Sequence, residues 1–247
     1  MDYFKSKVLS QTETAKGIYL LRLQVPEQQI KPGQFYMLKS WEDDFLPLMR
    51  PISVYRYGNG ILEFLYRMVG KGTLLFSRLE SGDEVDLLGA LGNGFPCTEV
   101  KGKIALVGGG IGIPPLYETA KTLRSLGNIV DVYLGYKDDL FLVDEFADTC
   151  DDLFIACENG YEGYKGYITD IVNHEKYDAI FTCGPEVMMF NLLKNSTLEP
   201  SQLWLSMEKR MACGIGACLT CNCETTHGMK RCCSEGPVFR GSEFTMN

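Results

Sequence analysis

Six cysteines crowd the end of the chain, and the first three have a spacing that suits a metal cluster. The six are Cys213, Cys218, Cys221, Cys223, Cys232 and Cys233. The first three follow a C-x4-C-x2-C pattern, which is typical of plant-type [2Fe-2S] ligands when a fourth cysteine lies further along. Gly214 and Gly216 allow a tight turn and free backbone N–H groups to point at sulfur. The tail is therefore predicted to bind an iron–sulfur cluster.

Spacing alone leaves two alternatives for these cysteines. A structural zinc also takes four cysteines, but usually from two C-x2-C pairs, and only Cys218 and Cys221 form such a pair. Thiols without any metal are the other alternative. The spacing also leaves open whether Cys232 or Cys233 would be the fourth ligand, and Cys223 is surplus to four.

A glycine-rich segment at residues 107–115 is the second feature with chemical meaning. It follows the apolar run 103–107 and reads V-G-G-G-I-G-I-P-P before a stretch with helical character. A dinucleotide pyrophosphate can bind at such a strand-to-helix turn, against free backbone N–H groups. The alternative is that the glycines serve close packing only. Pro115 stands where the usual fingerprint has its third glycine, so this is not the ordinary dehydrogenase version.

Two segments in the first hundred residues combine arginine with small or hydroxyl side chains. Residues 49–55 read M-R-P-I-S-V-Y, and residues 67–73 read R-M-V-G-K-G-T. The planar fork of arginine suits a pyrophosphate because it donates two hydrogen bonds at once. Taken alone, each segment is predicted to be an exposed hairpin rather than a binding site.

The elements that must position these residues fall into three parts. Short β-rich runs separated by turn residues fill residues 1–100 and predict an antiparallel β-barrel or sandwich. Apolar strands alternate with helical segments over residues 101–206, which predicts an α/β domain with a parallel sheet. Residues 207–247 form the cysteine-rich tail. No linker of low complexity separates the parts, so we expect them to pack together.

The composition narrows the class of protein. The chain has 247 residues, 45% of them hydrophobic, and 24 Lys and Arg against 32 Asp and Glu give a net charge of −8. These values predict a globular protein of one large or two ordinary domains and argue against nucleic-acid binding. No apolar run reaches the roughly 18 residues of a membrane span, and the start lacks a secretory signal. We therefore expect no membrane association and a cytoplasmic location.

The order of these parts resembles the ferredoxin-NADP reductase superfamily. The resemblance rests on R-P-I-S at residues 50–53, G-x-G-x-x-P at 110–115 and C-G-P-E-V-M-M at 183–189. The tail, from E-K-R-M-A-C at 208–213 to C-S-E-G-P-V-F at 233–239, narrows it further. There the chain is similar to the family of electron-transfer subunits of B-type dihydroorotate dehydrogenases, and the similarity covers essentially its whole length.

The resemblance implies a set of cofactor-binding residues. FAD would be bound by Arg50, Pro51, Ile52, Ser53, Leu65, Tyr66, Arg67, Gly72 and Thr73. NAD would be bound by Gly109, Gly110, Gly112, Cys183, Gly184 and Pro185. The [2Fe-2S] ligands would be Cys213, Cys218, Cys221 and Cys233, the last because the family's fourth cysteine stands three residues before G-P-V-F. No catalytic side chain is implied, since the chemistry passes through the cofactors.

The resemblance also implies a function in pyrimidine biosynthesis. A partner subunit would oxidise dihydroorotate at FMN, and electrons would pass through [2Fe-2S] and FAD to NAD+, in a heterotetramer with two copies of each chain. One alternative within the same fold is an NAD(P)H-dependent flavin and iron–sulfur reductase acting on ferredoxin or a sulfur compound. A zinc-stabilised binding module is the alternative from another class. Asp138 and Asp139 outnumber Lys137 after the second α/β strand and favour NAD over NADP.

Overall fold

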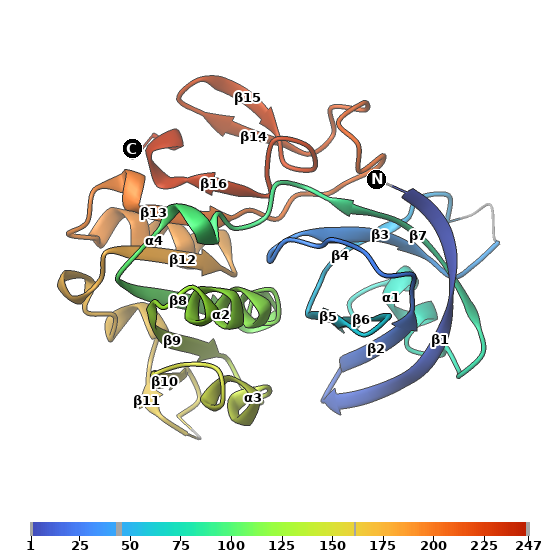
Figure 1. Ribbon diagram of the computed structural model, residues 1–247, viewed down its shortest axis with the longest axis horizontal. Helices are drawn as coiled ribbons and strands as arrows, with labels where there is room; N and C mark the ends of the chain where they lie inside the picture. Colours follow the sequence, from blue (N-terminus) through green and yellow to red (C-terminus); the bar gives the residue numbers. More distant parts are fainter. Residues whose placement is uncertain (1, 43–45, 161, 246–247) are drawn as a thin grey trace.

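The computed structural model describes residues 2–42, 46–160 and 162–245, and two seven-stranded sheets make up most of it. The strands of the first sheet are β1 (Asp2–Ala15), β2 (Ile18–Gln24), β3 (Phe35–Lys39), β4 (Arg50–Ser53), β5 (Arg56–Gly58), β6 (Ile61–Arg67) and β7 (Glu84–Leu91). They are antiparallel and lie in the order β4-β3-β7-β1-β2-β6-β5. The sheet curls into a barrel-like half of the molecule (Figure 1), which agrees with the predicted β-barrel.

The barrel strands form because their side chains alternate between core and surface. In β7, every second residue from Val85 to Leu91 is buried. This period of two places one face of the strand against the barrel core. That core includes Leu21, Tyr36, Phe64 and Phe76, all with no exposed surface. Phe76 comes from the short helix α1 (Lys71–Phe76), which follows β6.

The second sheet is parallel except at one edge. Its strands are β8 (Lys103–Gly109), β9 (Ile129–Tyr136), β10 (Asp152–Cys157), β11 (Tyr164–Lys165), β12 (Ala179–Cys183), β13 (Leu203–Ser206) and β16 (Val238–Arg240). They lie in the order β11-β10-β9-β8-β12-β13-β16, and only the β13–β16 pair is antiparallel. Six residues of β8 are buried, as expected for a strand covered on both faces.

Helices cover both faces of this second sheet. The helices α2 (Leu116–Ser125) and α3 (Val143–Ala147) contribute Leu116 and Phe146 to the hydrophobic cluster on one face. On the other face, α4 (Glu186–Asn195) contributes Met189 and Leu192 to a second cluster. The predicted α/β arrangement is therefore present.

The cysteine-rich tail is tied to both sheets. It forms a hairpin of β14 (Asn222–Thr225) and β15 (Gly228–Arg231), and its last strand β16 extends the second sheet beside β13. Figure 1 shows the tail running across the top of both halves of the molecule. The hairpin is thus a small sheet of the tail's own, whereas β16 belongs to the sheet of the α/β domain.

Candidate functional site

The glycine-rich segment lies where the strand order of the second sheet reverses. The chain passes from β8 outward to β9 and β10, then returns to β12 on the other side of β8. Ligands of open α/β sheets bind at the carboxyl ends of strands at such a switch point. Gly108 at the end of β8 is paired with Cys183 at the end of β12. The two segments expected to bind NAD therefore lie side by side.

Glycine is required at position 112 because the two segments touch there through their backbones, and Gly109 packs against a side chain of the second segment. A Cβ on Gly112 would lie 2.5 Å from the Cys183 carbonyl oxygen and 2.6 Å from Gly184 Cα. A Cβ on Gly109 would lie 2.5 Å from Met188 Sδ. The alternative of close packing thus accounts for these two glycines.

Gly110 differs from its neighbours. Its φ of +52° lies in the left-handed region that favours glycine. The nearest atom to a Cβ there would be Nη2 of Arg67, at 3.9 Å. Because Arg67 ends β6, the glycine-rich segment meets the barrel strand that the sequence assigned to FAD.

Cys183 is neutral at physiological pH. Burial raises the pKa of its thiol to about 12, although a hydrogen bond with Ser206 opposes the shift. The side chain is 9% exposed. It can therefore line a pocket as a small apolar group, but it does not offer a thiolate nucleophile.

Arg50 begins β4 and is held beside an aromatic ring and a glycine. Its guanidinium carbon is 5.4 Å from the centroid of the Trp41 ring. A Cβ on Gly72 would lie 2.7 Å from Arg50 Nε, so glycine at this position leaves room for the arginine. Arg50 and Gly72, which are separate in sequence, thus lie side by side, and Arg50 Nη1 donates to the Leu48 carbonyl.

The alternative that residues 67–73 form an exposed hairpin is wrong. Arg67 ends β6, and Gly72 and Thr73 lie in α1. The Thr73 hydroxyl accepts hydrogen bonds from the backbone N–H groups of Val69 and Gly70, at 2.9 and 3.1 Å. These bonds order the turn between the strand and the helix.

The remaining residues assigned to FAD fall into a half-buried group and a buried group. Pro51, Ile52 and Ser53 are half-buried in β4, at the edge of the first sheet. Leu65 and Tyr66 are buried, and Tyr66 accepts a hydrogen bond from Gln11 within the barrel. The Tyr66 side chain is therefore committed to a protein contact, whereas Leu65 lines a small hollow between the barrel and α3. A ligand on the other side of β6 could meet the strand mainly through its backbone.

Backbone N–H groups point at three sulfurs in the tail. Gly216 N–H donates to Cys233 Sγ at 3.1 Å, Cys218 N–H donates to Cys213 Sγ at 3.4 Å, and Cys233 N–H donates to Cys221 Sγ at 3.4 Å. Such bonds stabilise thiolates that bind metal and tune cluster potentials. The donor chemistry fits a [2Fe-2S] cluster. In the described part of the chain, however, no three Cys, His, Asp or Glu side chains already form a metal-binding group.

Cys232 and Cys233, which spacing could not separate, point to different places. The Cys232 thiol has no exposed surface and donates a hydrogen bond to the Met207 carbonyl, at 3.0 Å. Cys233 instead contacts the loop that carries Cys213, Cys218 and Cys221. The geometry supports Cys233 as the fourth ligand.

Two of the four cysteines have thiol pKa values shifted in opposite directions. Hydrogen bonds, first from the Thr220 hydroxyl, lower the pKa of the exposed Cys218 thiol to about 6. Burial raises the pKa of Cys233 to about 12. Metal ligation requires thiolates, so binding at Cys233 must release a proton.

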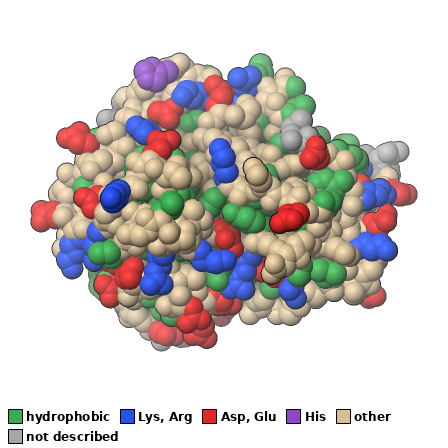
Figure 2. Space-filling model, in the orientation of Figure 1, with side chains coloured by type: hydrophobic (Ala, Val, Ile, Leu, Met, Phe, Trp, Pro, Cys, Tyr) green, Lys and Arg blue, Asp and Glu red, His purple; other side chains and the backbone are tan. Residues whose placement is uncertain are grey.

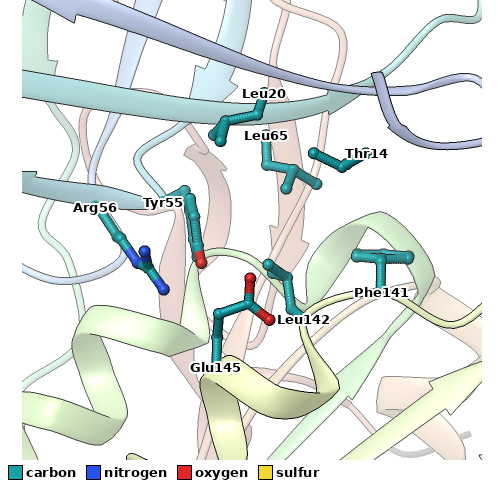
Figure 3. Close-up of a pocket in the computed structure, with 8 residues that line it drawn as sticks. All are labelled: Thr14, Leu20, Tyr55, Arg56, Leu65, Phe141, Leu142 and Glu145. Carbon is teal, nitrogen blue, oxygen red and sulfur yellow. The ribbon is translucent and has the colours of Figure 1, made fainter. Parts of the chain in front are cut away.

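Two hollows in the structure lie away from the glycine-rich segment. Figure 3 shows the smaller, of about 150 Å³, between the barrel and α3, where Tyr55, Arg56 and Glu145 converge. It is too small for a dinucleotide. A more open groove of about 540 Å³ is lined in part by Trp204 and Arg240. Neither hollow identifies the cofactor sites, which rest on the backbone contacts described above.

Charge is spread over the molecular surface seen in Figure 2. Basic and acidic side chains are interspersed on this face. The visible surface thus shows mixed charge rather than one large basic area. Among the described residues, none of the helices has the length and hydropathy needed to cross a membrane.

Comparison with known proteins identifies the family. Residues 208–245 match the iron-sulfur cluster binding domain of dihydroorotate dehydrogenase B. The chain is 44% identical to the dihydroorotate dehydrogenase B (NAD(+)) electron transfer subunit of Clostridium acetobutylicum, over 99% of this chain and 98% of that protein. The chain belongs to this family. The Bacillus cereus member is 40% identical over 97% of both chains.

Solved structures share the fold of this chain. The NADH-dependent reduced ferredoxin-NADP oxidoreductase structure, described for flavin-based electron bifurcation, superposes with a TM-score of 0.87 and 29% identity. The superposition covers 97% of this chain and 89% of the chain in that structure. A ferredoxin NADP+ reductase from Neisseria gonorrhoeae with bound FAD and NADP gives a TM-score of 0.66 at 17% identity, over 82% and 97% of the two chains. The second likeness shows the fold alone.

Proposed function

We propose that this chain is the electron-transfer subunit of an NAD-dependent dihydroorotate dehydrogenase in pyrimidine biosynthesis. It would carry electrons from the FMN of a catalytic subunit through [2Fe-2S] and FAD to NAD+. The observation that carries the proposal is the 44% identity to such a subunit over 99% of the chain. The arrangement of the three candidate sites supports it, because the cysteine loop and the glycine-rich segment both border the barrel.

The tail would bind the cluster through Cys213, Cys218, Cys221 and Cys233. Support comes from the three N–H groups directed at Cys213, Cys221 and Cys233. Cys223 and Cys232 are both buried and would remain thiols. Their role is then to fill the space beneath the loop.

The barrel would bind FAD through Arg50, Pro51, Ile52 and Ser53, with Gly72 and Thr73 beside the arginine. Leu65, Tyr66 and Arg67 would contribute backbone along β6, and Arg67 its exposed side chain as well. The guanidinium of Arg50 would offset the pyrophosphate charge. NAD would lie against Gly109, Gly110 and Gly112 on one side and Cys183, Gly184 and Pro185 on the other.

The division of chemistry follows from the cofactors. When bound, the cluster carries single electrons and the flavin exchanges a hydride with nicotinamide. The chain itself holds these groups in place, satisfies their charge and excludes water from the contact between the two glycine-lined segments. No side chain of this chain is needed to remove a proton from dihydroorotate, which is the task of the partner.

The partner would be the FMN-containing catalytic subunit, in a heterotetramer with two copies of each chain. We also propose a cytoplasmic location, since crowded cysteines that must remain thiolates or thiols suit a reducing compartment. NAD rather than NADP is favoured by Asp138 and Asp139, which follow β9 and would repel a 2′-phosphate.

A second candidate is a reductase subunit that works with ferredoxin. The TM-score of 0.87 with a reduced ferredoxin-NADP oxidoreductase favours keeping it, since that structure covers 97% of this chain. The two candidates differ in partner rather than in cofactors. Co-purification with an FMN-containing subunit that oxidises dihydroorotate supports the first, and co-purification with a ferredoxin-linked flavoprotein supports the second.

Spectroscopy of the freshly purified chain tests the cofactor assignment. Bound FAD with a [2Fe-2S] cluster gives a yellow-brown protein, with iron and FAD recovered on analysis. A colourless protein that contains zinc would contradict the proposal and favour a zinc-stabilised module. The protein should be prepared without oxygen, so that loss of the cluster is not mistaken for its absence.

A further inference from the structure

A loop of the barrel holds the segment that follows Cys233. Asn93, just after β7, donates through Nδ2 to the carbonyls of Val238 and Glu235, at 2.7 and 3.2 Å. Its Oδ1 accepts the Val238 N–H at 3.1 Å, and its own backbone N–H donates to the Gly236 carbonyl at 2.7 Å. One residue of the barrel thus makes four hydrogen bonds to residues 235–238 of the tail.

Close packing strengthens the same junction. A Cβ on Gly92, whose φ is +80°, would lie 2.4 Å from Pro237 Cδ. At the other end of the cysteine loop, a Cβ on Gly214 would lie 2.6 Å from Met37 Cγ. The tail therefore packs on the barrel at two places, directly after Cys213 and again after Cys233.

The part of the barrel that contacts the tail lies next to β4, the strand assigned to FAD. Met37 lies in β3 and is the cross-strand partner of Pro51 in β4. Gly214 thus packs against β3, the strand that pairs directly with β4. A shift of the tail on this surface would change the separation between cluster and flavin.

We propose that Asn93 is a positioning residue for electron transfer, which fixes the cluster-bearing tail at a set place on the flavin-binding barrel. The inference rests on the proposed function. Asn93 is exposed, and each hydrogen bond that the structure gives it goes to the tail and none to its own loop. Its amide therefore acts on the placement of the tail rather than on the barrel core. A functional site depends on supporting contacts that hold it in its productive geometry, so loosening them lowers its rate.

The substitution Asn93→Asp tests this inference without changing the size of the side chain. The carboxylate keeps an acceptor for the Val238 N–H but loses both donors and faces two carbonyl oxygens. Asn93→Ala removes all three side-chain bonds. Thr98→Ala, at an exposed residue in the turn Cys97–Glu99 of the same connection, is the matched control.

The assay uses the full chain loaded with FAD and cluster, and it follows two reactions of NADH. Reduction of a dye reports the flavin alone, and bleaching of the cluster absorbance in a stopped-flow instrument reports electrons that reach the cluster. A single hydrogen bond shifts an equilibrium by roughly twofold to tenfold, so we expect Asn93→Asp to slow cluster reduction by about tenfold. Dye reduction, FAD content and iron content should match the wild type. Hydrogen exchange of residues 235–240 should quicken.

Three results would overturn the inference. Cluster reduction at the wild-type rate in both Asn93 variants would show that the amide does not set the electron-transfer geometry. Equal slowing in Thr98→Ala would show a nonspecific effect. Loss of the cluster itself in Asn93→Asp would make the residue a requirement for assembly instead. A wild-type chain without FAD or cluster would instead refute the proposed function, which keeps the two failures distinct.

Discussion

Replacing Gly112 with alanine is the sharpest test of the contact between the two NAD-binding segments. The added Cβ would lie 2.5 Å from the Cys183 carbonyl oxygen and 2.6 Å from Gly184 Cα, whereas ordinary contacts begin near 3.4 Å. The segments would have to separate by almost 1 Å, and both neighbours are backbone atoms that cannot rotate away. Overpacking of this kind costs about 1 to 3 kcal/mol, and we expect the upper end.

The assay for Gly112→Ala combines thermal unfolding with steady-state reduction of a dye by NADH. For a chain of this length, about 2 to 3 kcal/mol lowers Tm by about 5 to 10 °C. A displacement near 1 Å can cost about a hundredfold in rate, so kcat/KM for NADH should fall at least about tenfold.

A matched control separates stability from the use of NADH. Gly127→Ala, after α2, meets no atom within 4 Å but has a φ of +81°, so it should cost about 1 to 2 kcal/mol of stability. Its KM for NADH should not change. Wild-type values of both Tm and kcat/KM in Gly112→Ala would refute the reasoning.

Three further predictions concern the ligands of each cofactor. Arg50→Ala should weaken FAD binding roughly tenfold or more with the fold retained, because a charge-assisted contact of about 1.5 to 3 kcal/mol is lost; unchanged FAD after dialysis would show that β4 is only structural. In Cys233→Ser the [2Fe-2S] spectrum should be lost or severely weakened, whereas Cys232→Ser and Cys223→Ser should keep it. An intact spectrum in Cys233→Ser would show that Cys233 is not the fourth ligand. NADPH should be a poorer electron donor than NADH, and Asp138→Asn should narrow the difference; equal kcat/KM for the two wild-type reactions would contradict the role given to the acidic loop.

The architecture could be predicted because its signals are local. The nearly continuous apolar run of β8 predicts a strand covered on both faces, and the glycines after it predict a turn into a helix. The C-x4-C-x2-C pattern is equally local, since it places three of the four expected cluster ligands in one short loop. Features of this kind depend on neighbours in sequence, so the printed residues are sufficient.

The contacts between distant segments could not be predicted. Sequence spacing gave no reason to prefer Cys233 over Cys232, because the choice depends on which thiol faces Met207 and which faces the cysteine loop. The burial of Tyr66 depends on the barrel closing around it. The junction at Asn93 joins residues far apart in the chain, and nothing in the local sequence indicates its partners. The final strand β16 is likewise defined only by the edge of the sheet that it joins.

Electron transfer from dihydroorotate to NAD+ tests the central claim most directly. The isolated chain, loaded with FAD and cluster, should pass electrons from NADH to a dye but form no orotate from dihydroorotate and NAD+. Adding the FMN-containing catalytic subunit should restore orotate formation, and Cys218→Ser should abolish the restored reaction while much of the dye activity remains, because hydride exchange at FAD does not require the cluster. Orotate formation by the isolated chain at a rate comparable to that of the complex would contradict this division of roles.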